Sequence, residues 1–289
     1  METTLIVGDL HLKQKFILPH VEQNMLDYGA KRVVFLGDAV NDWYASDSFE
    51  ISVMQFFADW VKQKRESGII VDVLLGNHDY CYIKGIEGPG THFANISQVS
   101  KILMDQLEVK VATTVGNWLC THAGVVQRWA EKYLKGYRRN SQWSAEEFAD
   151  VINSILGQKP RNWKVLYTVG HARGGFDEPS PLWSDLSELS TNPANNLNQI
   201  VGHTPVEKVF HRKNEFNGNE FEIWGCDTMS VYGGNLQPIG TGEMLLAEWS
   251  EVYDDFSIRA IPFDKYDEAS WNDVTWEYAR TQGVRGEFW

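Results

Sequence analysis

The sequence predicts an α/β protein built around a parallel β-sheet. Three short apolar runs, at Thr4–Val7, Lys31–Leu36 and Ile69–Leu75, have the length and composition of buried strands. Two longer segments with apolar residues at helical spacing, Ile17–Tyr28 and Phe49–Arg65, separate them. A β-α-β-α-β order implies right-handed crossovers, which place the three strands parallel in one sheet.

The rest of the chain continues this alternation of strands and helices. Residues Val109–Cys120 are predicted to form a hairpin. Residues Ser144–Leu156 are predicted to form a helix, because Ser144 and Glu147 make a capping box at its start. Four further strands are expected at Val165–Val169, Gln199–Val201, Phe221–Trp224 and Glu243–Glu248.

Residues 1–289 are expected to form a single domain. We find no internal repeat, low-complexity tract or linker, and 289 residues suffice for one large α/β domain. A catalytic core is expected over about residues 1–260. An acidic tail at about 261–289, containing Trp271, Trp276 and Trp289, is expected to pack on its surface.

The composition excludes several classes of protein. Hydrophobic residues make up 43% of the chain and charged residues 22%, which is typical of a globular protein. A net charge of −13 disfavours stable binding of nucleic acid, and no apolar run is long enough to cross a membrane. The cysteines Cys81, Cys120 and Cys226 form no CxxC pair, and a predicted strand leaves no room for a signal peptide. Both observations favour a cytoplasmic location.

Polar residues follow the first three predicted strands at the point where each strand ends. A Gly-Asp pair after the first strand contains Asp9, and His11 lies two residues later. A second Gly-Asp pair contains Asp38 after the second strand, and a Gly-Asn pair contains Asn77 after the third. The carboxyl ends of parallel strands meet at one edge of a sheet, where ligands collect. Each motif taken alone also fits a structural loop, an Asx turn or a helix cap.

Two histidines further along the chain, His122 and His203, also follow predicted strands. A single histidine is more often a structural residue than a ligand, and His171, also preceded by glycine, is an alternative to His203. Six candidate ligands at five strand ends nevertheless form two mixed nitrogen and oxygen sites that share Asp38. The pattern therefore predicts a centre for two divalent metal ions.

These motifs, in this order, resemble those of the calcineurin-like metallophosphoesterase superfamily. Its GDxH, GDxxD, GNH[DE], His-Ala-Gly and GHTP motifs correspond to Gly8–His11, Gly37–Asn41, Gly76–Asp79, His122–Gly124 and Gly202–Pro205. The Thr-Pro that follows His203 matches the superfamily and favours His203 over His171. Three segments resemble its phosphoprotein phosphatase and diadenosine tetraphosphatase branch, of bacterial or phage type: Pro181–Asp185, Cys226–Thr228 and Tyr232–Gly234.

The resemblance implies a four-layer α/β/β/α sandwich with two mixed β-sheets and a dinuclear metal centre at its rim. It assigns Asp9 and His11 to one ion, Asp38 as a bridge, and Asn77, His122 and His203 to the other. Manganese is the first choice, and iron, zinc and nickel suit the same ligands. A water activated by the two ions would attack phosphorus in line, without a covalent intermediate.

The resemblance also implies the catalytic residues. His78 would be the general acid for the leaving oxygen, with Asp79 completing its motif. The aspartate that orients this histidine in the superfamily is Asn41 here. Asn41 can still accept a hydrogen bond from His78 but would stabilise an imidazolium less well.

Phosphate binding is where the chain departs furthest from the superfamily, because its usual arginine is replaced by Asp42. Arg173, flanked by glycines, is the first candidate to replace it, since an arginine binds phosphate through two parallel hydrogen bonds. Arg128 is the second, and Asn77 is also a candidate for phosphate binding. Arg173 equally fits an ordinary surface arginine in a flexible loop.

Several functions remain open at this point. The leading one is hydrolysis of a phosphomonoester, as in a Ser/Thr phosphatase, or of a nucleotide phosphoanhydride, with a dinucleoside polyphosphate hydrolase as an alternative. A metallonuclease or phosphodiesterase would require a basic groove, and no run of Lys or Arg indicates one. A binding module without activity is supported only by the missing arginine. The expected partners are a phosphorylated small molecule, a nucleotide or a phosphoprotein.

Overall fold

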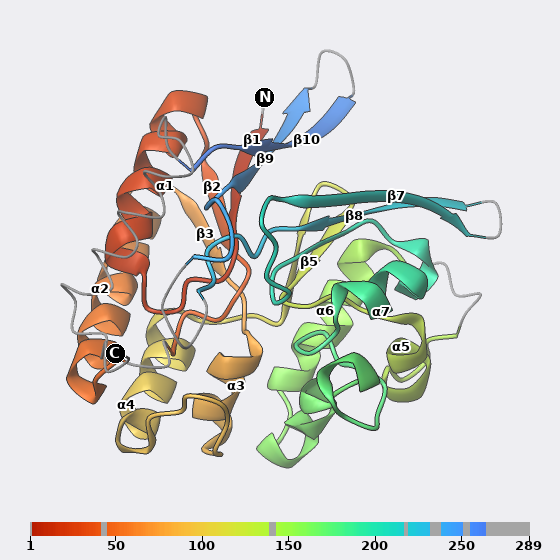
Figure 1. Ribbon diagram of the computed structural model, residues 1–289, viewed down its shortest axis with the longest axis horizontal. Helices are drawn as coiled ribbons and strands as arrows, with labels where there is room; N and C mark the ends of the chain where they lie inside the picture. Colours follow the sequence, from red (N-terminus) through yellow and green to blue (C-terminus); the bar gives the residue numbers. More distant parts are fainter. Residues whose placement is uncertain are drawn as a thin grey trace.

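The computed structural model describes residues 2–41, 45–138, 143–216, 219–231, 238–250 and 255–263. These residues form two mixed five-stranded β-sheets packed against each other, with helices on both outer faces (Figure 1). The four-layer α/β/β/α sandwich implied by the resemblance is confirmed. Most of the predicted tail at 261–289, including its three tryptophans, lies outside the described residues, as do Asp42 and Tyr232–Gly234.

The first sheet contains the predicted parallel core. Its strands are β1 (Glu2–Val7), β2 (Arg32–Phe35), β3 (Ile70–Val73), β9 (Met244–Ser250) and β10 (Asp255–Ile261), in the order β10-β9-β1-β2-β3. Strands β1, β2 and β3 are parallel, and β9 and β10 are added in antiparallel pairing. Helices α1 (Gln14–Tyr28) and α2 (Asp47–Glu66) form the two crossovers on its outer face (Figure 1).

The second sheet has the order β4-β5-β6-β8-β7. Its strands are β4 (Ala112–Val115), β5 (Trp118–Thr121), β6 (Gln199–Val201), β7 (Phe210–Phe216) and β8 (Asn219–Gly225). The predicted hairpin is confirmed, because β4 and β5 pair antiparallel, whereas β5, β6 and β8 run parallel.

The remaining helices form one group packed beside α2 and another on the outer face of the second sheet (Figure 1). They are α3 (Asn77–Lys84), α4 (Ile96–Lys101), α5 (Gln127–Tyr133), α6 (Ala145–Leu156) and α7 (Leu186–Thr191), with a π-helix at Ile102–Gln106 and 3₁₀ turns at Phe93–Asn95, Pro160–Tyr167, His171–Arg173 and Ala194–Asn196. The predicted capping box opens α6: the Ser144 hydroxyl accepts from the Glu147 N–H, and the Glu147 carboxylate accepts from the Ser144 N–H.

The prediction of a strand at Val165–Val169 is wrong. Residues Pro160–Tyr167 instead form a 3₁₀-helix with proline at its start, where its missing N–H is not needed. Trp163 and Leu166 are both buried, and a spacing of three residues brings side chains to the same face of a 3₁₀-helix. The local apolar run therefore reflects one buried helical face rather than a strand.

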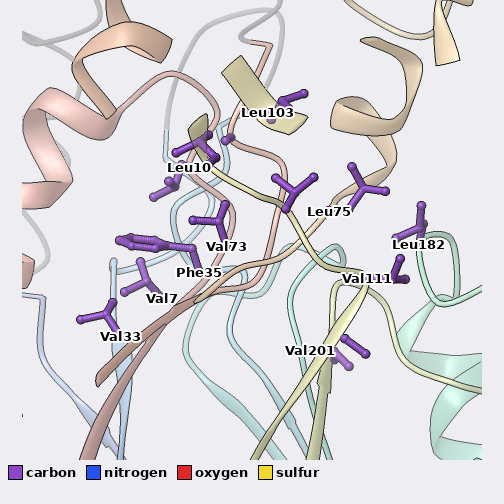
Figure 2. Close-up of a cluster of buried hydrophobic side chains, with 14 of the residues drawn as sticks. Val7, Leu10, Val33, Phe35, Val73, Leu75, Leu103, Val111, Leu182 and Val201 are labelled. Atoms are coloured by element: carbon purple, nitrogen blue, oxygen red, sulfur yellow. The ribbon is translucent and has the colours of Figure 1, made fainter. Parts of the chain in front are cut away.

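Successive side chains along a strand point to opposite faces of the sheet, so they pack in two different hydrophobic clusters. On β1, Leu5 and Val7 pack in the cluster beneath the helices, whereas Ile6 packs in a second cluster with residues of the other sheet. Figure 2 shows part of the first cluster, in which Val7, Phe35 and Val73 come from three neighbouring strands. Both faces of the parallel strands are thus buried, which leaves their carboxyl ends as the place for polar groups.

Candidate metal centre

The predicted ligands meet where strands from both sheets end. Asp9 follows β1, Asp38 follows β2, and Asn77 opens α3 after β3. His122 follows β5 and His203 follows β6. All five side chains are buried, and the remaining candidate, His11, is partly buried.

Asp38 lies at the middle of this cluster. Its Oδ2 is 3.9 Å from Nε2 of His11 and 3.4 Å from Nε2 of His122. Potential ligand atoms of Asp9, His11 and Asp38 lie within 4.8 Å of one another, as do those of Asp38, His122 and His203. Asn77 adjoins the second group, with Oδ1 2.9 Å from Nε2 of His122. Two groups of possible ligands therefore share one carboxylate, and each group could hold a metal ion.

The glycines that precede the ligands are required by close packing. A Cβ atom on Gly76 would lie 2.0 Å from Oδ1 of Asp38, and one on Gly202 would lie 2.2 Å from Oδ1 of Asp9. Both distances are far shorter than a van der Waals contact. At these two positions glycine therefore leaves room for a carboxylate from another strand end.

Backbone strain is concentrated at the same place. His11, Asp38, Asn41 and His203 have φ angles of 40°, 49°, 60° and 64°, in the left-handed region that non-glycine residues rarely adopt. Each such residue costs on the order of 1–3 kcal/mol, and strain of this kind clusters at functional sites. The surrounding fold therefore holds these side chains in directions that stability alone does not favour.

Two histidines are oriented by backbone carbonyl groups. Nδ1 of His122 is 2.9 Å from the carbonyl oxygen of Leu36, and Nδ1 of His11 is 2.9 Å from that of Asn41. A carbonyl oxygen only accepts, so each Nδ1 donates and each Nε2 is directed toward the carboxylates. This arrangement is typical of metal-binding histidines.

The electrostatics of the cluster fit a bound cation. Burial, with the nearby Asp227, raises the pKa of Asp9 well above its usual range. Burial lowers the pKa of His122, but the carboxylates of Asp38 and Asp9 outweigh it and raise that pKa to about 10. Nε2 of His203 is buried and has no hydrogen-bond partner in the part of the chain that the structure describes. Crowded carboxylates and an unpartnered imidazole nitrogen are the donors that a divalent transition metal accepts.

His78 lies beside the ligand cluster, with Nε2 4.0 Å from Oδ2 of Asp38. Its Nδ1 is 3.1 Å from Nδ2 of Asn41. An amide nitrogen only donates, so Asn41 donates to His78 here, whereas the sequence suggested that Asn41 accepts. The orientation of this amide determines which nitrogen of His78 carries a proton.

Asp79 is completely buried and is not among the residues that line the cavity described below. Its carboxylate accepts hydrogen bonds from the backbone N–H groups of Ala39, Val40 and Gly76, at 3.0, 3.2 and 2.9 Å. Burial and the nearby Asp38 raise its pKa to about 7. Asp79 thus ties the loop that carries Asp38 to the start of α3, and its catalytic role stays a prediction.

The cluster opens into a cavity of about 290 Å³. Side chains that line it include Asp9, His11, Asp38, Asn41, Asn77, His78, Arg173, Trp183, His203 and Asp227.

A model of the calcineurin-like phosphoesterase family matches residues 3–233 of the chain. The chain belongs to this family. Family membership implies hydrolysis of phosphoesters.

Solved structures are similar to this calcineurin-like phosphoesterase at low sequence identity. A cold-active protein-tyrosine phosphatase of a Shewanella species is 16% identical, with 91% of this chain and 81% of that chain covered and a TM-score of 0.54. A serine/threonine phosphatase of Saccharomyces cerevisiae is 14% identical, with 92% and 81% covered and a TM-score of 0.43. A dimetal phosphatase from Danio rerio is 13% identical, with 91% and 96% covered and a TM-score of 0.41. No curated protein matches the chain.

The two arginines proposed for phosphate binding lie in different places in this calcineurin-like phosphoesterase. Arg173 lines the cavity, where Nη2 donates to Oγ1 of Thr204 at 2.9 Å and Nε lies 3.1 Å from Asp185. Arg128 lines a separate pocket together with His171. The structure therefore brings Arg173 and His203 to the site and leaves Arg128 and His171 outside it.

Asp227 is a site residue to which sequence reasoning gave no role. It follows β8, is buried, and accepts a hydrogen bond from Oγ of Ser230 at 3.0 Å. Burial raises the pKa of its carboxyl group to about 6. Its position just after a strand was the available signal, but the residue before it is Cys226 rather than glycine.

In the part of the chain that the structure describes, no helix combines the length and apolar character that a membrane span requires.

Proposed function

We propose that the chain is a two-metal phosphoesterase that hydrolyses a phosphomonoester or a phosphoanhydride. The observation that carries this proposal is the pair of ligand groups that share Asp38, at the floor of a cavity that His78 and Arg173 also line. Family membership supports the reaction class.

The proposed mechanism gives each side chain a task. Asp9 and His11 would hold one ion, Asn77, His122 and His203 the other, with Asp38 between them. Two bound divalent ions neutralise phosphoryl charge and lower the pKa of a water molecule. Arg173 and His78 both line the cavity. Arg173 would bind a phosphoryl oxygen through its guanidinium group, and His78 would donate a hydrogen bond to the substrate.

Three further proposals accompany this function. Manganese is the first choice of metal, because the oxygen and nitrogen ligands suit it. A cytoplasmic location is supported by three buried cysteines, all free. The substrate belongs to one of the classes left open by the sequence: a phosphoprotein, a phosphorylated small molecule or a nucleotide anhydride.

Metal removal and return test the proposed reaction. Metal-free protein is expected to gain at least ~10³-fold in p-nitrophenyl phosphate turnover on addition of Mn²⁺, since metal ions contribute several kcal/mol to phosphoryl transfer. Elemental analysis of the active protein is expected to find two ions per chain. A folded, metal-supplied protein that binds no divalent ion, or that hydrolyses no phosphate ester or anhydride, would rule the proposal out.

A matched pair of arginine variants tests phosphate binding. Arg173→Gln is expected to lower kcat/KM by about 10- to 100-fold, mainly through a higher KM, because a charge-assisted hydrogen bond contributes about 1.5–3 kcal/mol. Arg128→Gln, outside the cavity, is expected to change kcat/KM by less than about twofold. Steady-state kinetics with one aryl phosphate measures both. Equal losses in the two variants would remove Arg173 from the site.

A further inference from the structure

Arg173 lines the cavity from the short turn His171–Arg173, whose first two residues are exposed. Its guanidinium group is nevertheless held by two other segments. Nη2 donates to Oγ1 of Thr204 at 2.9 Å, and Nε lies 3.1 Å from Oδ2 of Asp185, an ion pair without the geometry of a hydrogen bond. Nη1 makes no hydrogen bond with the described residues, so its two N–H groups are left for a ligand.

The hydroxyl group of Thr204 joins this arginine to the start of α7. Besides the hydrogen bond from Arg173, its oxygen accepts the backbone N–H of Leu186, the first residue of that helix, at 3.2 Å. Thr204 also directly follows His203, a proposed metal ligand. The residue next to a metal ligand, rather than the exposed turn alone, therefore determines where the guanidinium group lies.

The first turn of α7 holds the backbone of the same turn. One oxygen of Asp185 caps the helix, and the other lies beside Arg173. The carboxylate of Glu188 accepts the backbone N–H groups of Asp185 and Ala172, both at 3.2 Å. A Cβ atom on Gly170 would lie 2.4 Å from Oε1 of Glu188, so glycine is what lets the backbone approach this carboxylate.

These contacts reduce the entropy that an anion would otherwise have to remove from the arginine. An unrestrained arginine has many rotamers, and fixing one such side chain on binding weakens affinity by about 2- to 10-fold. Contacts made before the anion arrives avoid this loss. An arginine that only tied the turn to α7 would need no place in the cavity, whereas Arg173 lines it together with Asp38 and His203.

We propose that Thr204, Asp185 and Glu188 are positioning residues that hold the guanidinium group of Arg173 so that Nη1 is ready to bind a phosphoryl oxygen. This inference rests on the proposed phosphoesterase function, in which Arg173 binds the substrate. None of the three positioning residues lines the cavity. They act through Arg173, so losing one is expected to weaken phosphate binding without changing the metal content.

Thr204 is the best residue to substitute, because it is uncharged and its loss does not alter the charge near a bound phosphate. Thr204→Val keeps the shape of the side chain and removes the hydroxyl group. The Kd of inorganic phosphate for the Mn²⁺-loaded protein, measured by calorimetry, is expected to rise by about 3- to 10-fold. KM for p-nitrophenyl phosphate is expected to rise similarly, with kcat changed by less than about twofold. Thr204→Ser, which keeps the hydroxyl group, is expected to restore both constants. An unchanged Kd in Thr204→Val would overturn the inference.

The chain contains a second contact of the same kind, which serves as the control. Nη2 of Arg32 donates to Oγ1 of Thr113 at 2.9 Å, and Arg32 also pairs with Asp72. None of these residues lines the cavity. Thr113→Val loses an equivalent hydrogen bond elsewhere and is expected to change the Kd of phosphate by less than about twofold. An equal rise in Thr113→Val and Thr204→Val would overturn the positioning role.

A double variant shows whether Thr204 acts through Arg173. In the Arg173→Gln background, Thr204→Val is expected to change the Kd of phosphate by less than about twofold, because the guanidinium group that Thr204 holds is absent. Independent sites would instead multiply their effects. The same rise in both backgrounds would mean that Thr204 acts by another route, which contradicts the inference.

Glu188→Ala tests the first turn of α7 separately. It releases the backbone N–H of Ala172 and is expected to raise the Kd of phosphate by at least about threefold. Glu147→Ala is the matched control, because Glu147 has the same place in the capping box of α6 and accepts the N–H of Ser144 at 2.7 Å. Both variants are expected to lower the thermal stability, but Glu188→Ala alone to weaken phosphate binding. Equal Kd values in the two variants would remove α7 from the positioning role.

Metal content and turnover separate this inference from its rivals. Elemental analysis is expected to find the same metal content in Thr204→Val and the unaltered protein. A lower content in the variant would mean that Thr204 acts through His203, and the inference would fail. Absence of turnover with every phosphate ester and anhydride would defeat the proposed function, whereas turnover with one Kd of phosphate for both proteins would defeat only this inference.

Discussion

Asp38→Asn is expected to lower kcat/KM by at least ~10³-fold and to reduce the bound metal from two ions to one or fewer. Asp38 is the residue common to both ligand groups, so losing its charge weakens both. Asparagine has the same shape, and its side-chain oxygen can still accept the backbone N–H of His78, which lies 2.9 Å from Oδ1 of Asp38. The fold is therefore expected to persist.

Three measurements separate this result from general damage: kcat/KM, metal content and thermal unfolding. Asp59→Asn, at an exposed aspartate of α2, is the control and is expected to match the unaltered protein in all three. A fully loaded Asp38→Asn protein that keeps a tenth or more of the activity would show that Asp38 does not bridge two ions.

The part of the site that the sequence predicted depends on a simple geometric rule. Asp9, Asp38 and Asn77 follow the three parallel strands of the first sheet, so their convergence could be inferred from the order of elements alone. His122 and His203 come from the second sheet. The sequence prediction grouped them with the first three because they also follow predicted strands, and the resemblance supported this grouping. No local pattern states how two sheets face each other.

The parts that were not predicted depend on tertiary contacts or on polar strands. The hydrogen bonds of Tyr82 with Asn41 and Glu50 join segments 41 and 32 residues away along the chain. Strand β7, with the sequence Phe-His-Arg-Lys-Asn-Glu-Phe, lies at the edge of its sheet, where charged residues are common and apolar alternation is weak. Sequence patterns report burial, and neither feature produces a periodic apolar signal.

Gly76→Ala tests whether the reaction requires the space that glycine leaves for the carboxylate of Asp38. A Cβ atom here would lie 2.0 Å from Oδ1 and 2.3 Å from the backbone nitrogen of Asp38. The φ angle of Gly76 is −95°, which alanine adopts readily, so any effect is steric. Asp38 must move, and we expect kcat/KM to fall at least ~100-fold, since small displacements of catalytic groups have effects of this size.

The same substitution is expected to lower the free energy of unfolding by about 1–3 kcal/mol, the usual cost of overpacking. Gly157→Ala is the matched control, because Gly157 has a φ angle of −70° and the nearest atom to its added Cβ, the carbonyl oxygen of Ser154, is 3.4 Å away. Chemical denaturation and aryl phosphate kinetics on both variants measure the difference. Normal activity and metal content in Gly76→Ala would mean that Asp38 can shift without loss, and hence that its position between the two ligand groups is not what the reaction requires.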